Sequence, residues 1–318
     1  MIESILILAL GLVALYFGGR WLVGGSSQLA ASLGMRPFVI GLTIVGFGTS
    51  APEFFLSIIA NAENASAISL GNVIGANITN MTYVLGTAAF LTPLAIKFSI
   101  VRREGLVALA SVALLVLLVL GGGLEWWGGL LMIGAFAAYL VVFLATLQKC
   151  DPDSDVTCQF EDLGDDRWSR RRALGILALG MLVLVLGAQA VITGAIDIAS
   201  ELAISEVLIG VTVVAIGTTL PELTIAIFAG MKKRPDLAIG NALGTITFNT
   251  LVVLGAGSLV SGAIPVSSTV LFFGIIPMLA LVLLPIISLQ RFGGISRRLG
   301  LAMILLYPIY LVALLLVS

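Results

Sequence analysis

Two short motifs place acidic and hydroxyl side chains inside otherwise apolar segments of the chain. The first, "GTSAPE", contains Thr49 and Glu53, and the second, "GTTLPE", contains Thr218 and Glu222. In each motif the threonine and the glutamate are four residues apart, so their side chains share one face if the helical turn is kept. The proline lacks a backbone donor and interrupts the helical hydrogen bonds, which leaves carbonyl oxygens available. Each motif therefore offers carboxylate, hydroxyl and backbone oxygens together.

A second pair of segments adds side chains at intervals of four residues. These positions are Asn72, Ala76 and Asn80 in one segment and Asn241, Thr245 and Asn249 in the other. Oxygen ligands of this kind suit hard cations, and Ca²⁺ takes six to eight of them. The chain contains no histidine, so softer transition metals are poorly served. Two glutamates neutralise one divalent ion, and they could equally hold two or three monovalent ions.

The elements that position these residues are membrane helices. The chain has 318 residues, of which 59% are hydrophobic and only 10% charged, and its mean hydropathy is +1.17. A spanning helix needs about 20 mostly apolar residues. Ten such runs lie near residues 4–26, 37–61, 67–93, 103–122, 126–147, 173–195, 206–230, 237–261, 267–289 and 298–317. We expect an all-α integral membrane protein with no soluble domain of ordinary size.

The basic residues sort by loop. Every lysine and arginine except Arg20 falls in alternate loops or at their edges, and the opposite loops contain none. The basic side of a membrane protein is cytoplasmic, so both termini of a chain with ten spans lie outside. Residues 149–172 form the longest connection and are expected to be a solvated cytoplasmic linker. Its Asp151 imitates the start of a calcium-binding loop, but Val156 stands where that loop needs glycine.

An internal repeat relates the two halves of the chain. A shift of 169 residues places residues 41–86, which contain the first glutamate motif, over residues 210–255, which contain the second. We therefore divide the chain into a first five-helix repeat (1–148), the linker (149–172) and a second repeat (173–318). Because five is odd, the second copy crosses the membrane in the opposite direction. Inverted repeats of this kind are typical of secondary transporters, whose site lies near the bilayer midplane.

At these residues the chain resembles the sodium/calcium exchanger family of the calcium/cation antiporter superfamily, in its compact microbial type. That family carries G-[ST]-[ST]-x-P-[ED] followed by G-N-x-x-G-[ST]-x-x-x-N in two repeats. The resemblance implies an antiporter that exchanges Na⁺ for Ca²⁺ by alternating access, with gating by sliding of the first and sixth helices. It also implies that Glu53 and Glu222 are the central ligands of both ions.

Further ligands follow from the same resemblance. They are the backbone carbonyls of Thr49 and Thr218 for calcium, oxygens of these residues with Ser50 and Thr219 for flanking sodium sites, the carbonyls of Gly46 and Ala215 at outer positions, Thr245 for sodium, and Asn80 and Asn249 in the middle site. No cofactor is expected besides the transported ions. The expected surroundings are the lipid bilayer of a prokaryotic cytoplasmic membrane, with no nucleic acid and no obligate protein partner.

Two departures from the family pattern leave alternatives open. Ala76 stands where a hydroxyl residue is common, which puts the sodium stoichiometry in doubt. Asn249 stands where some microbial members and the potassium-dependent branch have aspartate, so potassium co-transport is less favoured. Coupling to protons is a secondary interpretation, since neither Gly-Asn motif carries the glutamate usual in the cation/proton branch. An intramembrane enzyme with paired glutamates, or a passive cation channel, are the competing classes.

Several polar and small residues have plain structural interpretations. Asn72 and Asn241 either cap helices or ligate a cation directly. Asn77 has the apolar Ile246 as its repeat counterpart, so we expect it to form hydrogen bonds between helices. Glycines of the first span are expected to be close-packing points; the examples are Gly18, Gly19, Gly24 and Gly25. The two cysteines, Cys150 and Cys158, lie in the linker and are treated as incidental.

Overall fold

The computed structural model describes residues 2–35, 37–146, 168–201 and 219–317, and most of them are helical. The α-helices are α1 (Ile2–Leu33), α2 (Pro37–Ile40), α3 (Gly46–Thr49), α4 (Ala51–Ala62), α5 (Ser66–Thr79), α6 (Leu85–Leu91), α7 (Phe98–Val119), α8 (Trp126–Ala145), α9 (Arg170–Glu201), α12 (Leu220–Met231), α13 (Pro235–Phe248), α14 (Leu254–Ser261), α15 (Ser268–Val270), α16 (Ile276–Phe292) and α17 (Arg297–Val317). Four π-helical segments continue them: η1 (Gly41–Val45), η2 (Asn80–Val84), η6 (Asn249–Val253) and η7 (Leu271–Ile275). The strands are β1 (Leu94–Ala95), β2 (Gly123–Glu125), β3 (Ala263–Pro265) and β4 (Gly294–Ile295).

Six helical stretches of the described chain are long and apolar enough to cross a membrane. They are Ile2–Leu33, Phe38–Ala62, Trp126–Ala145, Arg170–Gly194, Pro235–Ser261 and Ser268–Phe292. The other predicted spans coincide, over their described residues, with helical segments at 66–91, 98–119, 220–231 and 297–317. The all-helical membrane class is therefore confirmed, while the number of ten crossings and the outside location of both termini stay predictions.

Helix α1 extends beyond the predicted span of residues 4–26 and continues to Leu33. The extension contains Ser27 and Gln28, which are polar but buried, and the Ser27 hydroxyl donates to the carbonyl of Val23 at 3.0 Å. A hydropathy pattern marks residues that can face lipid, whereas the helix also includes polar residues buried against other helices. Helix α9 is longer than its predicted span, 173–195, at both ends.

The chain folds as two compact units that do not follow the repeat boundary. Unit 1 consists of residues 1–49 and 149–241, and unit 2 consists of residues 50–148 and 242–318. Each unit thus contains part of both repeats. The division of the sequence into two five-helix repeats stays a prediction, and the packing follows a different division.

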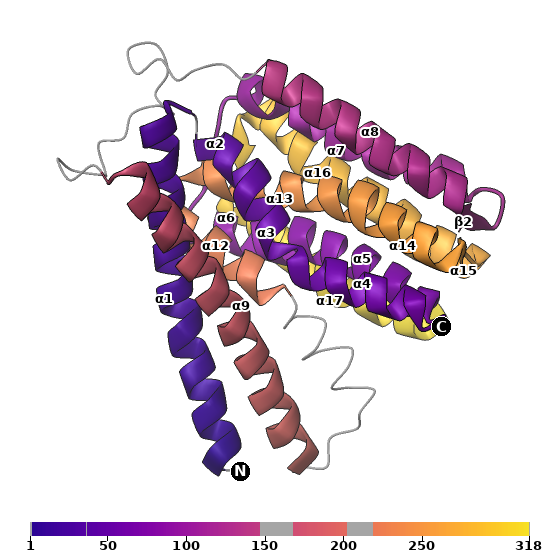
Figure 1. Ribbon diagram of the computed structural model, residues 1–318, viewed down its shortest axis with the longest axis horizontal. Helices are drawn as coiled ribbons and strands as arrows, with labels where there is room; N and C mark the ends of the chain where they lie inside the picture. The colour runs from indigo at the N-terminus through magenta and orange to yellow at the C-terminus, as the bar shows by residue number, and fades with distance from the viewer. Residues whose placement is uncertain (1, 36, 147–167, 202–218, 318) are drawn as a thin grey trace. The chain divides into compact units, whose positions relative to one another are not determined.

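Unit 1 is built on α1 and α9, which lie side by side along their length (Figure 1). Glycines at intervals of seven residues form the contact: Gly11, Gly18 and Gly25 in α1 and Gly180, Gly187 and Gly194 in α9. A Cβ atom on any of them would lie 2.6–2.9 Å from an atom of the opposite helix. Helices in lipid associate through such close backbone approach. The close-packing interpretation is confirmed for Gly18 and Gly25, whereas the nearest atom to a Cβ on Gly24 is 3.8 Å away.

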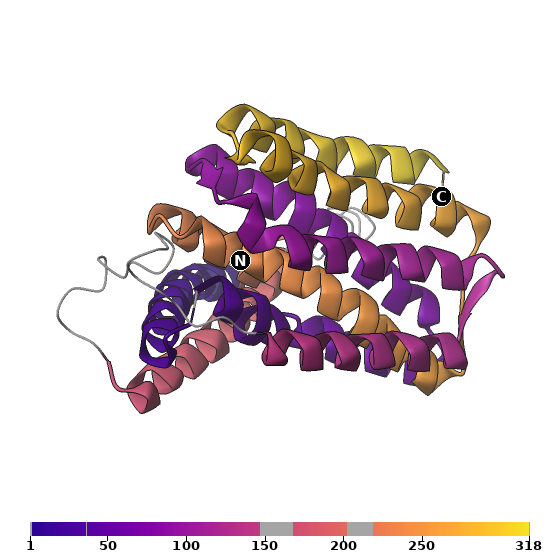
Figure 2. The ribbon, with the colours of Figure 1, turned by 90° about the horizontal axis from the view of Figure 1, so that it is seen from above.

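Two short antiparallel strand pairs join loops of different repeats within unit 2, and one of their strands, β2, is visible at the end of the helices in Figure 2. Strand β1, after the third predicted span, pairs with β4, before the tenth. Strand β2, after the fourth span, pairs with β3, before the ninth. Each pair therefore joins the third inter-span loop of one repeat to the fourth loop of the other. Consecutive loops of a spanning chain lie on opposite sides, so this pairing is the arrangement that inverted repeats require.

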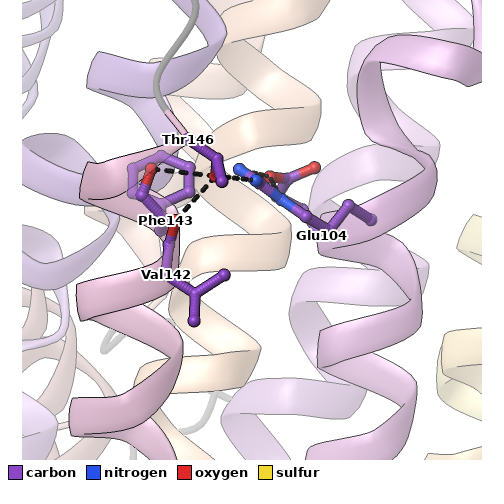
Figure 3. A network of polar contacts seen from close by, with 5 residues as sticks. Glu104, Val142, Phe143 and Thr146 are labelled. Carbon is purple, nitrogen blue, oxygen red and sulfur yellow. Dashed lines mark hydrogen bonds and ion pairs between the residues drawn. The ribbon is translucent and has the colours of Figure 1, made fainter.

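A polar network connects α7 to the end of α8 in unit 2 (Figure 3). The Arg103 guanidinium forms an ion pair with Glu104 at 2.7 Å and donates to the hydroxyl of Thr146, which in turn donates to the carbonyl of Val142 at 2.6 Å. Arg103 also lies over the ring of Phe143, 5.1 Å from its centroid. The side chain of Glu104 is almost fully buried, and an unpaired charge there would be costly. The ion pair with Arg103 compensates this charge.

Candidate functional site

Both glutamate motifs contain a helix start, at the place where the proline was predicted to interrupt the helical hydrogen bonds. In the first repeat α3 ends at Thr49 and α4 begins at Ala51, and Ser50 between them has φ −81° and ψ 3°. In the second repeat α12 begins at Leu220, and Thr219 before it has φ −95° and ψ 6°. Glu53 and Glu222 are therefore each the third residue of a helix. A helix N-terminus stabilises negative charge in its first turn, which favours the ionised carboxylates.

The two glutamates are almost completely buried. Glu53 is 2% exposed and Glu222 is 0% exposed. Burial of an ionised carboxylate costs several kcal/mol unless an opposite charge or hydrogen bonds compensate it. For Glu222, no hydrogen bond from the described residues reaches either carboxylate oxygen. A hydroxyl lies near it, that of Thr49, but this group donates to the carbonyl of Val45 at 3.1 Å. A cation is the partner that such a carboxylate suits.

Unit 1 brings together oxygen donors from both repeats. Helix α12, with Thr219 and Glu222, packs against α3, which ends at Thr49. Thr219 and Thr49 are 1% and 0% exposed. Asn241 is also fully buried, and neither atom of its carboxamide has a hydrogen-bond partner in the described part of the chain. Its interpretation as a cap is not supported by any described contact, and ligation of a cation stays a prediction.

Unit 2 assembles the remaining donors around Glu53. Helix α4 contacts both α5 and η6, so the helix that bears Glu53 lies against the segment that starts at Asn249. The rings of Phe54 and Phe248, which adjoin these two residues, have centroids 6.3 Å apart. This ring contact holds α4 against the end of α13, directly before Asn249.

The asparagine segments of the two repeats have the same local geometry. A π-helix starts at Asn80 in the first repeat and at Asn249 in the second. Such π-turns inside α-helices occur frequently at functional sites. The side-chain nitrogen of Asn80 donates to the carbonyl of Ala76 at 2.9 Å, and that of Asn249 donates to Asn77 at 3.3 Å. Within the described chain, the side-chain oxygens of Asn80 and Asn249 accept no hydrogen bond.

The other predicted ligands are two buried side chains, one backbone carbonyl and two residues that lie outside the described chain. Ser50 and Thr245 are buried, at 0% and 1% exposure, in unit 2. The carbonyl oxygen of Gly46 accepts a weak hydrogen bond from the Thr49 hydroxyl at 3.4 Å. Thr218 and Ala215 lie outside the described residues, as do both cysteines and the acidic stretch around Asp151.

Some polar contacts were not predicted. Ser57 and Asn61 continue the interval of four residues that begins with Thr49 and Glu53, and this spacing could have indicated them. The Ser57 hydroxyl contacts that of Ser69, and the side-chain nitrogen of Asn61 donates to the Ser57 carbonyl at 2.8 Å. These contacts extend the polar face of α4 and join it to α5.

The profile of the family described as "Sodium/calcium exchanger protein" matches residues 3–145 and 172–316, which include both repeats. The chain belongs to the sodium/calcium exchanger family. One relative in this family is the sodium/calcium exchanger MaX1 of Methanosarcina acetivorans, which is 32% identical over 98% of each chain. Another similar protein is the inner membrane protein YrbG of Escherichia coli, 30% identical over 82% of this chain and 81% of that one.

A solved structure agrees with this assignment. The sodium-calcium exchanger NCX_Mj, soaked with 10 mM Na⁺ and 10 mM Sr²⁺, has a TM-score of 0.83 and 28% sequence identity, and the match covers 98% of each chain. Membership of the sodium/calcium exchanger family confirms an integral membrane protein of the microbial type that mediates cation antiport. It excludes the intramembrane enzyme, because the relatives are exchangers and transporters.

Proposed function

We propose that the protein exchanges Na⁺ for Ca²⁺ across the membrane by alternating access, at a site formed by Glu53 and Glu222. The observation that carries the proposal is the matched burial of these carboxylates, at 2% and 0% exposure, on the third residue of two repeat-related helices. Ionisable residues in membrane segments are costly and mark ion pathways. The names of the relative MaX1 and of the structural neighbour NCX_Mj support the pair of ions.

The charge of the two glutamates supplies a physical basis for exchange. One Ca²⁺ neutralises both carboxylates, whereas two or three Na⁺ ions neutralise or exceed them. Reorientation of the empty site would carry two uncompensated negative charges through a low-dielectric core, which costs much free energy. Ions therefore leave only as others replace them. If the exchanged ions differ in total charge, each net elementary charge that crosses the membrane changes the free energy of transport by about 2.3 kcal/mol per 100 mV. This difference couples transport to the membrane potential.

The remaining oxygen donors complete the proposed site. They are Gly46, Thr49, Ser50, Asn80, Ala215, Thr218, Thr219, Thr245 and Asn249. Support comes from the burial of the side chains of Thr49, Ser50, Asn80, Thr219, Thr245 and Asn249. The side-chain oxygens of Asn80 and Asn249 are also without hydrogen-bond donors in the described structure, as a cation ligand would be before the ion binds.

The proposed membrane topology has ten spans, with both termini outside. The pairing of β1 with β4 and of β2 with β3 supports the inverted relationship of the repeats. The tight contact of α1 with α9 is consistent with first and sixth helices that move together. The substrate site would then be reached alternately from each side.

The experiment is calcium uptake into proteoliposomes loaded with sodium. Uptake should depend on an outward sodium gradient and should be lost in a Glu53→Gln Glu222→Gln double variant. The same vesicles test the alternatives, since added potassium or an imposed pH gradient drives uptake only if K⁺ or H⁺ is coupled. Uptake that is indifferent to the sodium gradient, or that persists in the double variant, contradicts the proposal. Flux that never saturates indicates a channel.

A further inference from the structure

Asn77 lies where three helical segments of unit 2 meet. Its side chain is fully buried and belongs to α5. The side-chain nitrogen donates to the hydroxyl of Thr250 in η6 at 3.1 Å and to the sulfur of Met278 in α16 at 3.5 Å. The side-chain oxygen accepts a hydrogen bond from the nitrogen of Asn249 at 3.3 Å. The predicted hydrogen bonds of Asn77 between helices are thus confirmed, and one of them reaches a proposed ligand.

These contacts fix the orientation of the Asn77 carboxamide first and, through it, that of the Asn249 carboxamide. A thioether sulfur can only accept a hydrogen bond, so the nitrogen of Asn77 is the atom that faces Met278. The oxygen of Asn77 then faces Asn249, and only the nitrogen of Asn249 can donate to it. The oxygen of Asn249 consequently points away from Asn77. This oxygen is buried and accepts no hydrogen bond from the described residues.

The first repeat reaches the same result by a different contact. The nitrogen of Asn80 donates to the backbone carbonyl of Ala76 one turn earlier. The side-chain oxygen of Asn80 therefore points away from this carbonyl, and it is buried without a hydrogen bond from the described residues. Within the described chain, the Asn249 side chain forms no such bond to its own helix, and its nitrogen donates to Asn77 instead. The repeat counterpart of Asn77 is Ile246, which has no hydrogen-bonding side chain. The device is therefore specific to one half of the molecule.

We propose that Asn77 is a positioning residue that holds the Asn249 carboxamide with its oxygen toward the cation, and thereby sets cation affinity without ligating the cation. This inference rests on the proposed function for the identity of the ion. Without Asn77, the Asn249 carboxamide can turn by half a rotation and present its nitrogen, whose partial positive charge repels a cation. A neutral carboxamide ligand can be inverted in this way, whereas a carboxylate has two equivalent oxygens and cannot.

The test measures calcium affinity and transport rate for substitutions at residue 77. Asn77→Leu keeps approximate size but removes both hydrogen-bonding atoms. We expect the half-saturating Ca²⁺ concentration to rise by up to about tenfold, the scale of one lost hydrogen bond between neutral groups. The maximal exchange rate should stay within about threefold of wild type, because no group that contacts the ion has been removed.

Two further variants separate positioning from packing. Asn77→Asp keeps an oxygen that accepts from the Asn249 nitrogen, so it should retain at least wild-type affinity. Thr250→Val removes one acceptor of the Asn77 nitrogen but leaves Met278, so its effect should be smaller than that of Asn77→Leu. Equal losses of affinity in Asn77→Asp and Asn77→Leu would overturn the proposal.

A double-mutant cycle with Asn249→Ala decides whether Asn77 acts through Asn249. Equilibrium binding of radioactive Ca²⁺ to the purified protein gives the affinity without transport. If Asn77 only positions Asn249, Asn77→Leu has no further effect in the Asn249→Ala background. An equal loss of affinity in both backgrounds rejects the proposal. If Asn77→Leu yields no folded protein, Asn77→Ala takes its place in the same cycle.

The cycle also distinguishes failure of this inference from failure of the proposed function. If wild-type vesicles show no sodium-dependent calcium uptake, the proposed function is wrong, and the cycle is measured with the cation that they do transport. Coupling between residues 77 and 249 for that cation supports the positioning role, and its absence rejects it.

Discussion

The backbone of Gly18 in α1 lies against the backbone of Leu184 in α9. A Cβ atom at residue 18 would be 2.7 Å from the Leu184 nitrogen and 2.9 Å from its Cα atom. The neighbouring atoms are backbone, so they cannot move aside as a flexible side chain can. The same relationship recurs seven residues away on each side, at Gly11 with Val191 and at Gly25 with Leu177.

Gly18→Ala should therefore lower the stability of the protein. Overpacking of a close contact typically costs about 1–3 kcal/mol. The matched control is Gly24→Ala in the same helix, where the nearest atom, the Lys232 Nζ, is 3.8 Å from the added carbon. That variant should be neutral or slightly stabilising, because alanine is favoured over glycine in a helix by up to about 1 kcal/mol. Melting temperatures in detergent check this, and equal values for the two variants would contradict it.

Glu222→Gln should abolish stabilisation of the protein by calcium. A ligand at 100 times its dissociation constant stabilises the folded state by about 2.7 kcal/mol. The wild-type protein should therefore melt at a higher temperature in saturating Ca²⁺ than in chelator, and the variant should not. In chelator the variant should be the more stable, because a buried charge has been removed. Glu125→Gln, on an exposed residue, is the control and should respond to Ca²⁺ like wild type.

Ala76→Ser should change the sodium dependence of exchange. Ala76 is 5% exposed and lies one turn before Asn80, and its repeat counterpart is Thr245. A hydroxyl at residue 76 adds an oxygen ligand on that flank, so the half-saturating Na⁺ concentration should fall several-fold. Thr245→Ala removes the corresponding hydroxyl and should raise it. Sodium titrations of calcium uptake give both values, and the prediction fails if either variant matches wild type.

Glu104→Ala should destabilise unit 2 without altering ion affinity. The side chain of Glu104 is 5% exposed, whereas that of its partner Arg103 is 43% exposed and screened by solvent. Loss of the contact should cost about 1–1.5 kcal/mol, the lower end of the range for a hydrogen bond to a charged group, because solvent screens Arg103. Arg102→Ala, on an exposed neighbour without a described role, is the control. A shift of the half-saturating Ca²⁺ concentration in Glu104→Ala would show that the network extends to the ion site.

Local chemistry explains what the sequence could predict. The interruptions of the helix at Ser50 and Thr219 follow from prolines and glycines within a few residues, and the membrane class follows from composition. The hydrogen bonds of Asn77 followed from the absence of a polar repeat counterpart. In each case the cause lies within one segment or in the comparison of two aligned segments.

Long-range packing explains what it could not predict. The extension of α1 to Leu33 depends on burial of Ser27 and Gln28 against other helices, which a hydropathy pattern does not record. The orientation of the Asn249 carboxamide depends on Asn77 and Met278, which are far away in the sequence. The contact of Arg103, the partner of Glu104, with Thr146 at the end of α8 likewise joins residues far apart in the sequence.

The composition of the two units has a consequence for assembly of the chain. Unit 1 contains the beginning of each predicted repeat, and unit 2 contains the remainder of each. Neither repeat therefore forms a complete unit by itself. The repeats are related as two protomers of a domain-swapped dimer would be, with the linker at 149–172 making their encounter intramolecular. A five-helix half synthesised alone would lack the partners of β1, β2 and α1, and two halves produced together should recover them from each other.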